Sequence, residues 1–187
     1  MANRDNPSGF IPAQGIGGDH VYKMFRVDSV NATAVFVGDV MDLDASGVGP
    51  AAADAGVSAV GVCVAVYDSD GLPCGSHNSS VATKYLPAST AGFALVALAI
   101  PGNVFICQTQ TGTTPTDDDI GLTSDHVAGA GDTTTARSRH ELTYSGGGLQ
   151  FRIIGKVDKP GNDYGEHVDL YVVFNESAFG VSAAASV

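Results

Sequence analysis

The stretch DLDASG, residues 42–47, places side-chain oxygens at alternate positions, as the start of a calcium-binding loop does. Asp42, Asp44 and Ser46 occupy those positions. The twelfth position of such a loop needs a bidentate Glu, and here it is Ala53. The mismatch favours an ordinary turn over a metal site.

Three adjacent carboxylates, Asp117, Asp118 and Asp119, form a second group that could bind a hard cation. Adjacent side chains cannot all point the same way, and no His or further acidic residue stands at a fixed spacing nearby. Acidic residues also cap short helical turns, so TPTDDDIG favours a capped turn.

The histidines are dispersed along the chain as His20, His77, His126, His140 and His167. His140-Glu141 is not followed by the second His of the zinc-protease motif H-E-x-x-H, and no G-x-S-x-G nucleophile elbow occurs. The sequence therefore predicts no cofactor and no metal. A hydrolase whose Ser, His and Asp meet only in the fold stays open as an alternative.

The three cysteines, Cys63, Cys74 and Cys107, argue against a disulfide framework or a zinc ribbon, because their number is odd and no C-x-x-C spacing occurs. Cys63 and Cys107 lie inside apolar runs, and we expect both to be buried.

Short apolar runs separated by Gly, Pro and Asp predict strands throughout the chain. Pro101-Gly102 predicts a hairpin turn between two of these runs. No stretch of ten residues has apolar residues spaced to form one face of a helix. The fold class is therefore all-β, as a compact β-barrel or β-sandwich. The predicted strands lie within 20–28, 33–43 with a break at Gly38-Asp39, 57–68, 93–100, 103–110, 149–153 and 168–174, with a turn at 159–165 before the last.

Two segments lack the regular spacing of apolar residues that a strand or a helix would show. Residues 1–18 predict an extended N-terminal arm, followed by a single all-β domain at 19–187. Residues 109–148 are rich in Thr, Asp, Ser and Gly and predict a long loop. Loops of this length inside compact domains are usually functional or ordered by a partner.

Composition excludes several partners. Of 187 residues, 44% are hydrophobic and 16% charged, which is typical of a globular chain. The net charge is −11 and the nine basic residues form no cluster, so we expect no nucleic acid. The apolar run 93–100 is far shorter than a membrane span. Arg4 and Asp5, followed by Pro and Gly, do not begin a secretory signal, so we expect the protein to be made and used without Sec export.

Five motifs in order carry a family resemblance: MANRDNPSGFIPA, AVFVGDVMDLDASG, GVCVAVYDSDG, VFICQTQ with DDDIG downstream, and RIIGKVDKPGNDYGEHVDLYVVFN. Together they resemble the capsid decoration, or cement, proteins of tailed bacteriophages. The resemblance implies a non-enzymatic protein of the outer capsid surface that braces the major capsid protein, commonly as a homotrimer at local threefold positions. A net charge of −11 fits an outer surface.

The arm supplies the contacts that this role implies. Phe10, Ile11 and Pro12 are expected to form an apolar anchor, with Arg4 and Asp5 as salt-bridge partners on the shell. The alternative for Phe10 is that it folds back onto its own core as a staple. An alternative function is a head-fibre or receptor-binding module that grips glycans through 109–148, although Tyr144 is the one aromatic residue of that segment and sugar sites usually stack aromatics.

Overall fold

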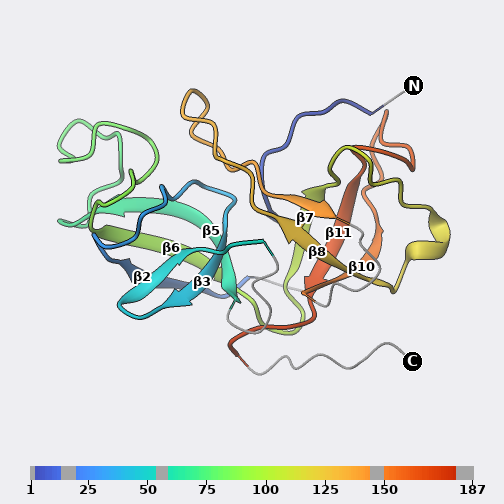
Figure 1. Ribbon diagram of the computed structural model, residues 1–187, viewed down its shortest axis with the longest axis horizontal. Helices are drawn as coiled ribbons and strands as arrows, with labels where there is room; N and C mark the ends of the chain where they lie inside the picture. The colour runs from blue at the N-terminus through green and yellow to red at the C-terminus, as the bar shows by residue number, and fades with distance from the viewer. Residues whose placement is uncertain (1–2, 14–19, 54–58, 144–149, 180–187) are drawn as a thin grey trace.

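The protein folds into two antiparallel β-sheets arranged as a sandwich, neither of them closed into a barrel (Figure 1). The computed structural model describes residues 3–13, 20–53, 59–143 and 150–179. Sheet A contains, in spatial order, β1 (Ile11–Pro12), β7 (Val104–Gln108), β11 (Asp169–Phe174), β10 (Phe151–Lys156), β8 (Thr123–Val127) and β9 (Glu141–Thr143). Sheet B contains β2 (Tyr22–Val27), β6 (Gly92–Leu98), β5 (Ala59–Asp68), β3 (Val40–Asp44) and β4 (Gly47–Pro50). The all-β prediction is confirmed, in the sandwich-like form.

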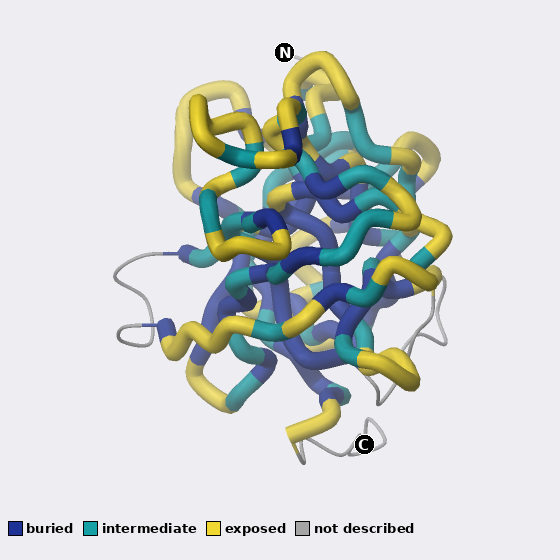
Figure 2. The backbone as a smooth tube through the Cα atoms, turned by 90° about the vertical axis from the view of Figure 1, so that its left-hand side faces the viewer, coloured by how far each residue is buried: buried dark blue, intermediate teal, exposed yellow. Residues whose placement is uncertain are grey.

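The main hydrophobic core lies between the two sheets. Alternate residues of a strand point to opposite faces, so Val62 of β5 and Ala97 of β6 meet Phe105, Phe151 and the other inward residues of sheet A. Figure 2 shows the buried backbone running through the middle of the molecule, with exposed backbone in the peripheral loops. None of the described residues forms a helix that is both long and apolar enough to cross a membrane.

A second core fills the other face of sheet B, where Val60, Cys63 and Val66 of β5 contact Met41 and Leu86. Sheet B curls around this core until its edge strands approach each other. The approach requires Gly47 of β4, because a Cβ at this position would collide with the backbone carbonyl of Arg26 in β2. Gly47 also has φ +150, which side-chain-bearing residues rarely adopt.

The loop that covers the second core is organised by Asp68, the last residue of β5. Its buried carboxylate accepts hydrogen bonds from the Ser79 hydroxyl at 2.7 Å, from the Leu72 amide at 2.8 Å and from the Ser80 amide at 2.9 Å. These donors, the Ser79 hydroxyl foremost, lower the pKa of Asp68 to about 2 against the opposing effect of burial. One carboxylate therefore fixes the fold of a segment with little regular structure.

Several predicted elements are confirmed. Residues 42–47 form the β3–β4 hairpin, in which Asp44 pairs with Gly47. Asp117–Asp119 form the 3₁₀ turn η2, where the Asp119 carboxylate accepts the Thr116 amide at 2.7 Å. The last two predicted strands pair as β10 and β11, and Cys63 and Cys107 are buried.

The predicted hairpin at Pro101-Gly102 is wrong. β6 pairs with β2 and β5 in sheet B, whereas β7 pairs with β1 and β11 in sheet A. The turn is real, since the Asn103 side chain donates to the carbonyl oxygen of Leu98 at 2.8 Å, but it carries the chain from one sheet to the other. A turn motif reports a change of direction and does not identify the strand partner.

The prediction that 109–148 is one long loop is also corrected, because β8 and β9 lie inside it and pair with each other. Ser124, Asp125 and His126 of β8 are polar yet buried. Short strands with polar interior residues carry no apolar alternation, which is the signal that strand prediction relies on. Residues 144–148 lie outside the described residues, as does the predicted arm boundary at residue 18.

Candidate functional site around the N-terminal arm

The arm lies along sheet A and is fixed to it by hydrogen bonds (Figure 1, dark blue). The side-chain amide of Gln108 donates to the carbonyl oxygens of Arg4 and His167, both at 3.1 Å. Its oxygen accepts the backbone amide of Asn6 at 2.9 Å. Asn3 donates to the carbonyl oxygen of Glu166 at 2.9 Å. The arm is thus extended, as predicted, but it is bound to its own domain.

The second half of the arm enters the sheet. Ile11 and Pro12 form β1 and pair with Ile106 and Phe105 of β7. Just before them, Gly9 has φ +70 and a backbone so close to neighbouring main chain that a Cβ would not fit. Proline and glycine, which made the arm look unstructured, are the residues that permit this edge-strand path.

Phe10 is buried, with 1% of its surface exposed. Its ring stacks on Phe151 with a centroid distance of 4.6 Å and meets the ring of His126 edge-on at 6.4 Å. This corrects the expectation that Phe10 is an exposed anchor and supports the alternative that it folds back as a staple. The reason is that a phenyl ring buries more apolar surface in the available sandwich core than anywhere on the arm itself.

The other predicted contact residues lie on the surface. Ile11 is 45% exposed, Pro12 is partly exposed, and Arg4 and Asp5 are exposed. Ile11 and Pro12 border an apolar hollow of about 470 Å³ that Val37 and the segment 135–137 also line. The structure therefore separates the five predicted residues into one core residue and four surface residues.

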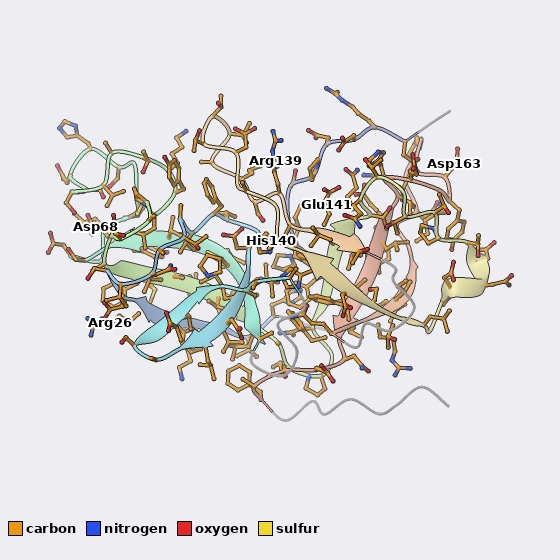
Figure 3. The ribbon with its side chains drawn as sticks, viewed as in Figure 1. Arg26, Asp68, Arg139, His140, Glu141 and Asp163 are labelled. Carbon is orange, nitrogen blue, oxygen red and sulfur yellow. The ribbon has the colours of Figure 1, made fainter. Side chains whose placement is uncertain are left out.

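Asp5 is brought to two residues that the sequence did not connect with it. A polar hollow of about 870 Å³ lies between the arm and the segment 129–141, and both Asp5 and Glu141 line it. Nδ1 of His167 is 3.9 Å from the Asp5 carboxylate. Burial raises the pKa of Glu141, and the charge of Asp5 raises it further. Figure 3 shows Glu141 beneath the arm, with Arg139 beside it.

A buried polar pair lies deeper, between the two sheets, where Figure 3 labels His140. Nε2 of His140 is 3.5 Å from the Asp39 carboxylate, and its Nδ1 accepts the backbone amide of Val40 at 3.2 Å. Burial raises the pKa of Asp39 to about 7. Burial, with the charge of His126 adding to it, lowers the pKa of His140 to about 3, so the imidazole is neutral.

This pair lacks the geometry of a catalytic triad. A triad histidine uses one nitrogen for the carboxylate and the other to take the proton of the nucleophile. In His140 that second nitrogen is occupied by the amide of Val40. The nearby Ser138 is fully buried, and its hydroxyl accepts the His140 amide at 3.0 Å. Burial also raises the thiol pKa of Cys63, which disfavours a thiolate.

The face of sheet B opposite the second core extends beyond its contact with sheet A, and this outer part carries two rows of exposed and half-buried side chains. Met24 pairs with Leu95, and Arg26 pairs with Phe93, which in turn pairs with Tyr67. Met24 is 45% exposed, and the apolar members Leu95, Phe93 and Tyr67 are half-buried. We call Tyr22, Met24, Leu95, Phe93 and Tyr67 the outer apolar face. The sequence predicted the β2 strand but gave this face no role, although the alternation in VYKMFRV is its signal.

Comparison of the chain with protein-family models, with curated proteins and with solved structures gives no match.

Proposed function

We propose that the protein is a non-enzymatic structural protein of a phage virion. It binds the outer surface of the icosahedral capsid as a homotrimer and stabilises contacts between major capsid subunits. The observation that carries the proposal is the outer apolar face, which is preformed on a rigid sheet. Contiguous apolar surface with aromatic side chains favours docking to another protein.

The charge distribution is compatible with this role. A net charge of −11 disfavours contact with packaged DNA and suits the outside of the shell. The arm contributes Ile11 and Pro12 at the border of an apolar hollow as a second contact region. Because hydrogen bonds and the Phe10 staple already order the arm, docking loses little conformational entropy.

The chemistry of the polar residues supports a binding role over catalysis. The buried Asp39–His140 pair is not arranged for acid–base catalysis, because both nitrogens of its imidazole are engaged. A glycan-binding role for 109–148 has less support, since 109–143 contains no Phe, Tyr or Trp and Tyr144 lies outside the described residues.

The test is sedimentation of the purified protein with expanded, DNA-free capsids of its phage, followed by quantification against the major capsid subunit. We expect saturable binding in a fixed ratio. Met24→Asp should weaken binding at least tenfold, because a charge on the outer apolar face must be desolvated on docking. Val30→Asp is the matched control, since Val30 is 71% exposed in a turn outside that face.

Two results would contradict the proposal at different points. If the wild-type protein does not sediment with capsids, the virion role is wrong. If Met24→Asp and Val30→Asp bind equally well, capsid binding stands but the outer apolar face is not the docking surface. Far-UV circular dichroism of both variants checks that the sheet is intact.

A further inference from the structure

Three side chains with metal-binding atoms converge where the arm meets sheet A. Asp5 comes from the arm, Glu141 begins β9, and His167 stands two residues before β11. One ligand atom from each lies within 4.8 Å of the others. The three positions span most of the chain, so their convergence is a product of the tertiary fold.

Two of these side chains each have a buried polar atom without a hydrogen bond. Oε1 of Glu141 and Nδ1 of His167 are both inaccessible to solvent, and neither has a hydrogen-bond partner among the described residues. A buried polar atom without a hydrogen bond is unfavourable, because it has lost its hydrogen bond to water. Both atoms belong to the same cluster, so one bound cation would satisfy them together.

The surrounding residues hold the cluster in place. Gln108 binds the backbone on both sides of Asp5, through Arg4 and Asn6, and also binds the backbone of His167. One amide therefore sets the distance between two of the three groups. The other imidazole nitrogen of His167, Nε2, lies 3.5 Å from the hydroxyl of Thr111. A metal-binding histidine commonly donates from its second nitrogen to an oxygen acceptor, which leaves the first nitrogen free for the metal.

The local charge also favours a cation. Asp5 and Glu141 bring two carboxylates together. The nearby Arg139 offsets part of this charge, but its guanidinium is paired with Asp132 at 3.1 Å. The polar hollow that Asp5 and Glu141 line lies beside the cluster and exposes the Asp5 carboxylate to water and ions.

We propose that Asp5, Glu141 and His167 bind a divalent first-row transition metal ion, best represented by Zn²⁺, with water completing the coordination. Imidazole nitrogen and carboxylate oxygen are both Zn²⁺ ligands, whereas Ca²⁺ prefers oxygen ligands alone. The ion ties the arm to β9 and to the segment before β11. This inference is independent of capsid binding.

The test is isothermal titration calorimetry of the full, metal-stripped chain with ZnCl₂, with CaCl₂ in parallel. We expect one saturable Zn²⁺ site in the micromolar range or tighter and at least tenfold weaker binding of Ca²⁺. Asp5→Asn and His167→Asn should each weaken Zn²⁺ binding at least tenfold. His167 has φ +58, a conformation that Asn tolerates well, so that variant should fold. Asp158→Asn removes one exposed charge outside the cluster and should bind like wild type.

A second readout follows the arm itself. Saturating Zn²⁺ should slow amide hydrogen exchange in residues 3–8 of the wild-type protein and leave it unchanged in His167→Asn. Absence of saturable Zn²⁺ binding up to millimolar concentration would overturn the proposal. So would equal Zn²⁺ binding by wild type, Asp5→Asn and His167→Asn, because the ion would then sit elsewhere, or tighter binding of Ca²⁺ than of Zn²⁺.

Discussion

Replacement of Phe10 by Ala separates the two roles considered for the arm. In the structure the ring is 1% exposed, stacks on Phe151 at 4.6 Å and contacts His126 edge-on. Truncation of a buried Phe destabilises a core by about 3–5 kcal/mol, including the cavity that it leaves. That is a large share of the roughly 5–15 kcal/mol that stabilises a typical domain. For a chain of this size it corresponds to a fall in Tm of roughly 6–20 °C.

The assay is urea unfolding followed by far-UV circular dichroism, because the chain has no tryptophan to report by fluorescence. Ile11→Ala is the matched control: Ile11 is the adjacent residue, it is 45% exposed, and its truncation should lower the unfolding free energy by less than about 1 kcal/mol. A Phe10→Ala variant as stable as Ile11→Ala would refute the argument that the arm is stapled into the core. It would return Phe10 to the candidates for shell contact.

Three further perturbations test the fold. Gly47→Ala should destabilise the protein by more than about 1 kcal/mol, because its Cβ meets the carbonyl of Arg26. Gly165 has a comparable φ of +133 but open space around it, so Gly165→Ala should be clearly milder in thermal unfolding, and equal effects would contradict the close approach of the sheet edges. Asp68→Asn should weaken the dependence of the unfolding free energy on pH in the acid range. The pKa of Asp68 is lowered to about 2 in the folded state, so the carboxylate stabilises the protein fully above the unfolded value of 3.8 and loses this effect as the pH falls through 2. An unchanged pH dependence in acid titration would count against the hydrogen-bonded carboxylate. Asp39→Asn should become more stable relative to wild type as the pH rises from 4 to 8. Burial raises the pKa of Asp39 to about 7 in the folded state, so the native wild-type protein holds a proton there that the unfolded chain releases, and wild type loses stability over this range. Urea unfolding at the two pH values measures the difference in unfolding free energy between variant and wild type, and a constant difference would argue against the raised pKa.

Prediction from the sequence succeeded where one strand or one turn carries its own signal. Leu170 and Val172 alternate with Asp169 and Tyr171, and with Phe174 they lie in β11 facing the core. Asp119 caps its own turn through a residue three positions away, so local chemistry was sufficient. Prediction failed for β8 and β9, whose buried Ser124 and His126 look like loop residues because their environment is supplied by distant strands.

The candidate site likewise combines features that the sequence shows with features that only the fold brings together. The sequence identified Asp5 as an exposed charged residue of the arm, but Glu141 and His167 stand more than 130 residues further on and share no motif with it. The outer apolar face is visible within β2 as alternating Tyr22 and Met24, yet its other residues come from β5 and β6. Which residues share a surface depends on strand pairing, and pairing is not a local property.

The sequence by itself determined the all-β class, the positions of most strands and turns, and the acidic, unclustered charge, because alternation, turn chemistry and composition act over a few residues. Only the tertiary structure decided that Pro101-Gly102 connects two sheets, that Phe10 completes the core and that Asp5 meets Glu141 and His167. These outcomes depend on free energies of burial and hydrogen bonding between distant segments. An isolated arm has no surface on which to bury Phe10, and the folded sandwich provides one.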